Sequence, residues 1–468
     1  PKGLFNWVTF DSQNLLGVGT NQKYYIQNSP GAGYNDVTPI YSIVTLGTNP
    51  FATTTGSRLV TVTHTAHGQY LNTYVIYTNT GTVTVGGVTV ASIAGVEFEI
   101  VNIIDANTYQ VMAPANATST ATGGTGVVAN YEIPAGTTTY ISGTGWGAPP
   151  WSGGGWGGTS GLPPLQQLRL WSADNYQQDL IFNPRGGPVY YWAYVDPNTF
   201  NRAITLNVKA NNTIKYTSKL VTGTSGTNTL TIAAPDSTDF INVGAVVTDG
   251  ASIPANTTVT AISGLTVTLS ANLTGNILTG TTINFSYAGK FVPNTTNYVT
   301  ASNAQHFTIC LGANPYDPTN SSNYFDPMLV RWSDQDVPWD FVPTTFNQSG
   351  EQHLANGSYL VCTKNMRQEI LVWSDAALFS MQYLGPPYVW GFNLLMDNVT
   401  IAGPNAAVTV NNTAFWMGMD KFFTYNGVVN TLPCTLRRWV FENINQTQLF
   451  QVTCGSNEGF NEVWWHYP

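Results

Sequence analysis

The feature of this sequence that most constrains its fold is a repeated unit in which a strand, a turn and a second strand end in an aromatic residue. Four copies lie near the C-terminus, and their closing aromatic residues are Trp332, Trp373, Phe423 and Trp464. These residues are separated by 41, 50 and 41 positions. A repeat of roughly 40 to 50 residues is typical of the blades of a β-propeller. The spacing therefore predicts an all-β propeller.

Further copies place the repeat along the rest of the chain. Each copy has two short apolar runs separated by a turn, and the paired runs are 15–18 with 24–26, 180–182 with 189–192, 306–311 with 328–332, 359–362 with 370–373, 414–416 with 422–423, and 451–454 with 463–464. We expect each pair to form an antiparallel hairpin within one blade.

Two segments differ from the repeat because they are rich in Thr, Val, Gly and Ala and almost free of Trp. Residues 53–136 alternate apolar and polar side chains at 60–63 and 82–85, which predicts strands with one buried face. Gly86-Gly87 reads as a hairpin turn. Residues 216–285 contain three predicted strands, with Ser263-Gly264 as the turn between the last two; the strands are 229–232, 258–262 and 265–269. We interpret both segments as small inserted β-sandwich or barrel domains.

The propeller then comprises residues 1–52, 137–215 and 286–468. Removing the insertions leaves about 314 residues, and at roughly 45 residues per blade this predicts about seven blades, with six or eight as alternatives.

Composition supports this fold and limits the functions that fit it. Only 9% of the residues are charged, whereas a typical domain has about 25%, and Thr, Val, Tyr and Trp suit strands. The net charge is −9, and no run of Lys or Arg could neutralise a row of phosphates. We therefore expect no tight binding to nucleic acid, although an acidic surface would let DNA pass without sticking.

The sequence gives little support for catalysis. Asp334, Asp336, Asp375 and Glu462 are the acidic residues that a glycosidase would have to bring together, and whether they meet stays open at this stage. The segment 333–339 is similar to the aspartate box of sialidases, but Val337 replaces its glycine and that box is structural. We expect no catalytic residue and no cofactor.

Metal ligands are also sparse. His64 and His67 would point to opposite faces of a strand. The four cysteines lie far apart without metal-ligand spacing, so we expect buried free thiols; they are Cys310, Cys362, Cys434 and Cys454. The sequence predicts no metal site.

A Gly-rich and Pro-rich segment at 143–161 carries Trp146, Trp151 and Trp156. It cannot form a regular strand. Its indoles either pack on a neighbouring subunit, as interface aromatics do, or fold back onto their own domain.

Three strings of the repeat resemble phage proteins of one family. They are PRGGPVYYW at 184–192, RQEILVWSD at 367–375 and NEVWWHYP at 461–468. These strings resemble the tail nozzle proteins, or tail tubular proteins B, of short-tailed bacteriophages. Residues 46–52 and the strand segment at His67-Gly68 fit the same family.

The resemblance implies a virion structural protein of the phage tail. Such subunits form a hexameric ring below the adaptor and portal, a conduit and gate through which DNA passes during ejection. Tail fibres or other tail proteins attach around the ring. Because the sequence has no stretch of 18 or more apolar residues, we expect no membrane insertion by this chain. Family members are usually longer, so we expect Pro1 and Pro468 to lie inside a longer polypeptide. The competing hypothesis is a carbohydrate-binding adhesin or receptor-binding tail protein that stacks exposed aromatic residues on sugars.

Overall fold

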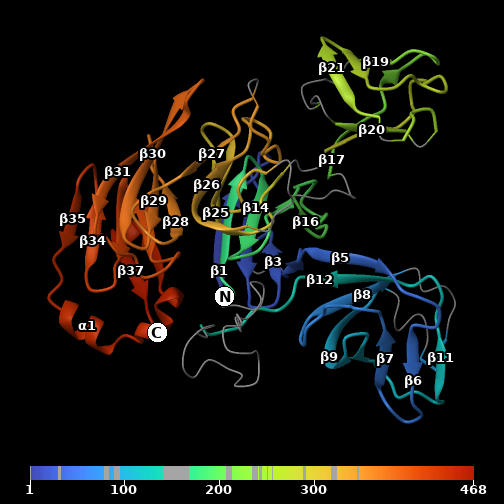
Figure 1. Ribbon diagram of the computed structural model, residues 1–468, viewed down its shortest axis with the longest axis horizontal. Coiled ribbons are helices and arrows are strands. Elements are labelled where there is room, and N and C mark those ends of the chain that lie inside the picture. The colour runs from blue at the N-terminus through green and yellow to red at the C-terminus, as the bar shows by residue number, and fades with distance from the viewer. Residues whose placement is uncertain are drawn as a thin grey trace. The chain divides into compact units, whose positions relative to one another are not determined.

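The computed structural model contains strands through most of its length (Figure 1). It describes residues 2–29, 33–78, 84–88, 95–140, 168–206, 213–233, 241, 245–249, 251–255, 257–287, 291–317, 324–344 and 347–468. These residues divide into two compact units. The first comprises 1–205, 293–338 and 342–468, and the second comprises 206–292 with 339–341. The helices of the described residues are too short or too polar to cross a membrane.

The first unit contains five antiparallel sheets of four strands, and in each sheet the strands lie side by side in sequence order. Sheet 1 consists of β1 (Gly3–Val8), β2 (Asn14–Gly19), β3 (Tyr24–Gln27) and β4 (Asn35–Asp36). Sheet 2 consists of β13 (Trp171–Tyr176), β14 (Asp179–Pro184), β15 (Tyr190–Trp192) and β16 (Ile204–Thr205). Sheet 3 consists of β24 (Thr296–Ser302), β25 (Phe307–Ala313), β26 (Asp326–Trp332) and β27 (Gly350–His353).

The C-terminal part of the chain continues this pattern. Sheet 4 consists of β28 (Leu360–Asn365), β29 (Ile370–Ser374), β30 (Ala377–Gly385) and β31 (Val389–Asp397). Sheet 5 consists of β32 (Ala407–Val410), β33 (Thr413–Met417), β34 (Phe422–Tyr425) and β35 (Val429–Leu432). The helix α1 (Arg437–Asn443) and a 3-10 helix (Gln446–Gln451) follow, and the two-stranded sheet 6 joins β36 (Thr453–Asn457) to β37 (Glu462–His466). The prediction of an all-β chain is confirmed.

The first strands of successive sheets contact one another. The contacts join β1 to β13, β13 to β24, β24 to β28, β28 to β32, and β32 to β36. Lys2, next to β1, donates to Oε1 of Gln451 at 2.9 Å, so the residues that lead into sheet 1 and sheet 6 also meet. The first strands of the six sheets thus contact one another in succession.

The uneven spacing of the closing aromatic residues has a simple cause. The six predicted copies fall in six different sheets and each forms a hairpin there. However, Trp332 and Phe423 lie on the third strand of their sheets, whereas Trp373 and Trp464 lie on the second. The chain is longer between the second strand of one sheet and the third strand of the next than between a third strand and the second strand of the next sheet. This alternation produces the spacings of 41, 50 and 41 residues.

The estimate of about seven repeats stays a prediction. The described residues hold six sheets of this kind outside the insertions, and the last has two strands. The estimate assigned every residue outside the insertions to a blade, but the segment from Arg437 to Gln451 is largely helical. Such segments lower the number of blades that a given length can form.

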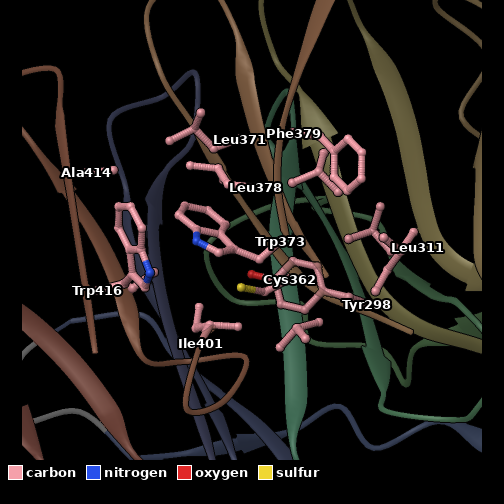
Figure 2. Close-up of a cluster of buried hydrophobic side chains, with 14 of the residues drawn as sticks. Tyr298, Leu311, Cys362, Leu371, Trp373, Leu378, Phe379, Ile401, Ala414 and Trp416 are labelled. Atoms are coloured by element: carbon pink, nitrogen blue, oxygen red, sulfur yellow. The ribbon is translucent and has the colours of Figure 1, made fainter. Parts of the chain in front are cut away.

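Aromatic side chains fill the space between neighbouring sheets. Trp373 of sheet 4 and Trp416 of sheet 5 are fully buried, and their rings meet edge to face at 5.4 Å (Figure 2). Between sheets 1 and 2, the rings of Tyr24 and Phe182 stack at 4.3 Å. These rings lie on the second or third strands of their sheets, where the repeat places its aromatic residues. Aromatic residues at these positions therefore form the core between sheets.

A glycine in β2 allows sheets 1 and 2 to approach closely. A Cβ atom on Gly19 would lie 2.2 Å from Cδ1 of Trp171, which is too close for any side chain. The Trp171 indole also donates to the carbonyl oxygen of Thr20 at 2.7 Å. Gly19 therefore provides the space in which Trp171 packs.

The first insertion forms an eight-stranded antiparallel sheet in the order β11-β6-β7-β10-β9-β8-β12-β5. Its strands are β5 (Ile40–Thr45), β6 (Phe51–Thr53), β7 (Leu59–Thr63), β8 (Tyr74–Thr78), β9 (Glu97–Asp105), β10 (Thr108–Met112), β11 (Ala121–Gly123) and β12 (Val128–Glu132). The sheet curls, since Phe51 and Tyr77 lie on distant strands but their rings meet at 5.1 Å.

This sheet begins before residue 53, where we placed the start of the insertion. β5 lies in the segment assigned to the propeller, and it pairs with β12. Burial alternates along Ile40–Thr45, but the sequence IYSIVT has no alternation of apolar and polar residues that would predict it. The predicted strand at 60–63 lies in β7, and the Gly86-Gly87 turn joins the paired Val85 and Val88 with both glycines at positive φ. Part of the predicted strand 82–85 lies outside the described residues.

The second unit consists of two small antiparallel sheets. One has the order β17 (Thr213–Ser218), β23 (Ile283–Tyr287) and β20 (Val246–Thr248). The other has the order β18 (Val221–Thr222), β19 (Thr229–Ile232), β22 (Thr266–Leu269) and β21 (Val259–Ser263). The predicted strand 229–232 matches β19. The last turn is shifted by one residue, because Ser263 pairs with Thr266 and Gly264 takes the positive φ.

Candidate functional site

The first two strings of the family resemblance lie where neighbouring sheets meet. Arg185 follows β14 of sheet 2, and its guanidinium donates to the carbonyl oxygens of Asn297 in β24 at 3.3 Å and of Val361 in β28 at 3.1 Å. It also lies over the ring of Phe450 at 5.3 Å. Burial lowers the pKa of Arg185 to about 10. One half-buried cation thus connects sheets 2, 3 and 4 with the segment that precedes sheet 6.

Glu369 has a similar role between sheets 4 and 5. Its carboxylate accepts from the hydroxyl of Ser380 in β30 and from the hydroxyl of Tyr425 in β34, the latter at 2.8 Å. The residues of these strings therefore act in packing between sheets.

The hairpin formed by β30 and β31 is the longest in the described sheets outside the insertion and extends past the end of β29 (Figure 1). Its end next to the turn is anchored on sheet 3. Tyr383 and Trp390 pack against each other at 5.4 Å and against Phe307 at 5.8 and 5.4 Å, respectively. The Tyr383 hydroxyl donates to Oε1 of Gln348 at 3.0 Å. The hairpin is therefore held in one position.

The tip of this hairpin is apolar and exposed. Leu384 and Tyr388 have 59% and 77% of their surfaces exposed, and they flank the Pro386-Pro387 turn. Leu394 and Met396 of β31 are also exposed. β31 is the last strand of sheet 4, and no strand of the described residues pairs with its outer edge. An anchored apolar tip beside a free strand edge is typical of a protein–protein contact. We call Leu384, Tyr388, Leu394 and Met396 the hairpin surface.

A second exposed apolar group lies near the end of the described chain. It includes Trp439 of α1, Phe460, and Trp464 of β37, which is the edge strand of sheet 6. Trp465, the next residue, is directed inwards, and its indole donates to the carbonyl oxygen of Ala406 at 3.0 Å. Sheet 6 is thereby fixed to sheet 5 while its outer edge stays open.

A charged cluster joins sheets 1 and 2 to the eight-stranded sheet. Lys23 lies between the carboxylates of Asp36, Glu97 and Glu132, and its Nζ is 3.0 Å from Oδ2 of Asp36 and 3.6 Å from Oε2 of Glu132. Arg202 approaches the same three carboxylates, at 2.8 Å from Asp36, 3.1 Å from Glu97 and 2.7 Å from Glu132. We call these five residues the charged cluster.

The cluster is neutral if one carboxyl group holds a proton. Glu132 has only 1% of its side chain exposed, and its contacts with the two cations are close without being well-aligned hydrogen bonds. Burial, followed by the neighbouring Glu97, raises the pKa of Glu132 to about 9. Despite burial, the carboxylates raise the pKa of Lys23. Protonated Glu132 with ionised Asp36 and Glu97 would balance the two cations.

The three carboxylates of the charged cluster could hold a metal ion by their spacing alone, because one oxygen of each lies within 4.8 Å of the others. Lys23 and Arg202 already occupy the space between these oxygens. The arrangement thus fits an ion-pair network better than a cation site. The sequence did not predict this cluster, because its members are scattered from residue 23 to residue 202.

Of the four acidic residues that we considered for glycosidase chemistry, Asp334 and Asp336 share one turn, and each of the four has its own hydrogen-bond partners or exposure. Asp334 follows β26 and accepts from the backbone amides of Gln335 and Gln348. Asp336 pairs with Nδ1 of His306 at 2.5 Å. Asp375 accepts from the amide of Ser358, and Glu462 is exposed on β37. The segment at 333–339 therefore acts as a turn, with Asp334 and Val337 bridged.

The prediction for the histidine pair is wrong. β7 ends at Thr63, so His64 and His67 lie in the following turn, where Ala66 and Gly68 have positive φ. Their rings lie 6.4 Å apart instead of on opposite faces. His64 shares a 2.7 Å hydrogen bond with the hydroxyl of Tyr131, and Nε2 of His67 lies 2.9 Å from the carbonyl oxygen of Asp105.

The cysteines are free, as predicted. Cys310 and Cys362 are buried, whereas Cys434 and Cys454 are only half-buried. The Trp-rich segment 143–161 lies outside the described residues.

Comparisons with known proteins add little to this description. No known protein family matches the sequence, and no curated protein matches it. A solved structure, the endosialidase of phage phi92, aligns with 88% of this chain at 10% sequence identity and a TM-score of 0.18. The chain covers 42% of that protein. A similarity of this size does not support a shared function.

Proposed function

We propose that sheets 1 to 6 are the blades of one β-propeller, with β36 and β37 as the beginning of a sixth blade. Three observations support this proposal. Each complete sheet has four strands in sequence order, which is the topology of a blade. The first strands contact one another in succession, as the innermost strands of blades do. Lys2 and Gln451 connect the first sheet to the last.

We also propose that the protein is a structural subunit of a bacteriophage tail, a nozzle protein without catalytic activity. In this role several copies, six by family resemblance, form a ring below the adaptor and portal through which DNA leaves the capsid. The family strings support the proposal, since two of them supply residues that join neighbouring sheets. The net charge of −9 also suits a wall along which DNA must move without binding.

The hairpin surface is the observation that most directly supports assembly into a ring. Tyr383 and Trp390 pack on Phe307 next to the turn of the hairpin, while Leu384 and Tyr388 stay exposed at its tip. Exposing apolar side chains on a rigid support costs solvation free energy unless a partner covers them. In a ring, each copy would place this tip on a different surface of its neighbour, which is a heterologous contact. Tail fibres or other tail proteins would use the surfaces that remain.

The hairpin surface allows a direct test of assembly. The double variant Leu384→Ser with Tyr388→Ser should shift the purified protein from a ring to monomers, measured by native mass spectrometry or light scattering. Buried aromatic anchors commonly contribute about 2 kcal/mol or more to an interface. Val428→Ser is a matched control, because Val428 is an exposed apolar residue at a turn of sheet 5.

The outcomes separate the competing functions. Loss of the ring in the double variant, with an intact ring in the control, supports the conduit. A protein that is monomeric before any substitution, or that assembles equally well in both variants, argues against this interface. Binding of the unassembled chain to host glycans would favour the carbohydrate-binding adhesin instead.

A further inference from the structure

Two adjoining cavities lie among the first strands of the six sheets. The larger has a volume of about 430 Å³ and is lined by residues at the start of β1, before β13, and in or next to β28, β32, β36 and β37. The smaller has a volume of about 210 Å³. Gly3, Leu4, Lys364 and Asn405 line both. A volume of this size is typical of a small-molecule site.

The larger cavity differs in charge from the rest of the chain. Lys2, Lys364 and His466 line it, and none of its lining residues is acidic. The sequence as a whole has 25 acidic residues and 16 Lys and Arg. Basic groups are therefore concentrated here in a protein that is otherwise acidic, and a cavity walled by protein strengthens the field of such charges.

Neither Lys2 nor Lys364 forms an ion pair with a carboxylate within the described residues. Lys2 donates to the carbonyl oxygen of Thr138 at 2.5 Å and to Oε1 of Gln451 at 2.9 Å, which are both neutral acceptors. Lys364 is half-buried, and its ammonium group makes no hydrogen bond or ion pair within the described part of the chain. Burial also lowers the pKa of Lys2, as expected for an ammonium group without a counter-charge.

One acidic residue lines the smaller cavity, and its carboxylate already accepts hydrogen bonds from the protein. Asp174 lines the smaller cavity, and it accepts from the hydroxyl of Thr300 at 2.7 Å and from the amide of Ala301 at 2.9 Å. It makes no ion pair with Lys364 within the described residues, although the Lys364 charge favours its ionised form. The side-chain amide of Asn405, which borders both cavities, makes no hydrogen bond within the described residues and can donate to a ligand.

We propose that this cavity binds a small oxyanion, either a phosphate or a carboxylate group. Lys364 supplies the unpaired positive charge, and Lys2, His466 and Asn405 supply further donors. Charged hydrogen bonds to oxyanions are stronger than neutral ones, so a few donors on this wall suffice for recognition. The site is separate from the hairpin surface, and its failure would leave the assembly proposal untouched.

Titration calorimetry on the purified 468-residue chain tests the proposal, with inorganic phosphate and glucuronate as probes at constant ionic strength. Glucose and sodium chloride are the controls for a neutral sugar and for general salt effects. We expect at least one of the two oxyanions to bind, with no heat from glucose. Binding of phosphate alone, of glucuronate alone or of both identifies the source of the oxyanion, and each of these results supports the site.

Substitutions locate the binding. Lys364→Gln should weaken binding at least tenfold, whereas Lys421→Gln, a lysine beside Asp420 in sheet 5, should leave it unchanged. If Lys364→Gln lowers the melting temperature of the free protein, Asn405→Ala serves as the second variant and should weaken binding in the same direction. Absence of binding by both oxyanions, or equal affinity in the wild-type protein and the cavity variants, would overturn the proposal.

Discussion

Replacing Lys23 with methionine should loosen the junction between sheets 1 and 2 and the eight-stranded sheet. Lys23 has 7% of its side chain exposed and lies against three carboxylates, while Arg202 is the other cation of the charged cluster. With Glu132 protonated the cluster is neutral. The Lys23→Met variant would leave one buried negative charge without a partner. Breaking a buried ion pair on one side costs about 3–5 kcal/mol.

The same reasoning predicts a much smaller effect for Glu132→Gln. If Glu132 carries a proton, the amide replaces a neutral group of the same shape, and the free energy of local opening should change by less than about 1 kcal/mol. The contrast between the two variants therefore reports the protonation state of Glu132. It does not depend on the total stability of the chain.

Hydrogen–deuterium exchange with mass spectrometry measures this contrast where it arises. Amides of β12, which ends at Glu132, should exchange on the order of a hundredfold faster in Lys23→Met, since about 1.4 kcal/mol corresponds to a factor of ten. Amides of β29 serve as the internal reference. Lys421→Met, in an exposed ion pair, should have almost no effect. Equal acceleration by Glu132→Gln and Lys23→Met would refute the neutral cluster.

Three further predictions follow from the same structure. The raised pKa of Glu132 stabilises the fold most below the ordinary value of 4.5, and this contribution is lost as the pH rises towards about 9. The melting temperature of the wild type relative to that of Glu132→Gln should therefore fall across this pH range. A constant difference between the two melting temperatures would contradict the raised pKa. Gly19→Ala should lower the free energy of unfolding by about 1–3 kcal/mol, because the added Cβ atom would clash with the Trp171 indole. Gly47→Ala should leave it unchanged, because the space around Gly47 is open. Thermal melts followed by tryptophan fluorescence distinguish the two variants. Arg185→Met should destabilise the chain by about 3 kcal/mol or more, because the carbonyl oxygens of Asn297 and Val361 would lose the guanidinium that donates to them. An unchanged midpoint of urea unfolding would show that water replaces the guanidinium.

The sequence was informative where a pattern is local. Alternation predicted the strand at β7 and the run at β19, and Gly86-Gly87 predicted a turn that needs positive φ twice. The repeat of aromatic residues also located one hairpin in each of six sheets. Each of these signals depends on neighbours within a few residues.

Other features depend on residues that are far apart in the chain. Trp332 and Trp373 look equivalent in sequence but occupy different strands of their sheets, since nothing local fixes which hairpin of a sheet carries the aromatic residue. β5 pairs with β12 across more than eighty residues, so its membership in the inserted sheet was not evident. Lys23 and Arg202 meet only because three sheets converge. Long-range convergence of this kind determines both the charged cluster and the cavity around Lys364.

Electron microscopy of the protein in its native particle tests the central proposal most directly, with mass analysis of the purified oligomer beside it. The account predicts a six-fold ring below the adaptor, in which each subunit is a propeller and the hairpin surface is covered by a neighbouring copy. Monomers or trimers at the tips of fibres, with Leu384 and Tyr388 facing solvent, would contradict it.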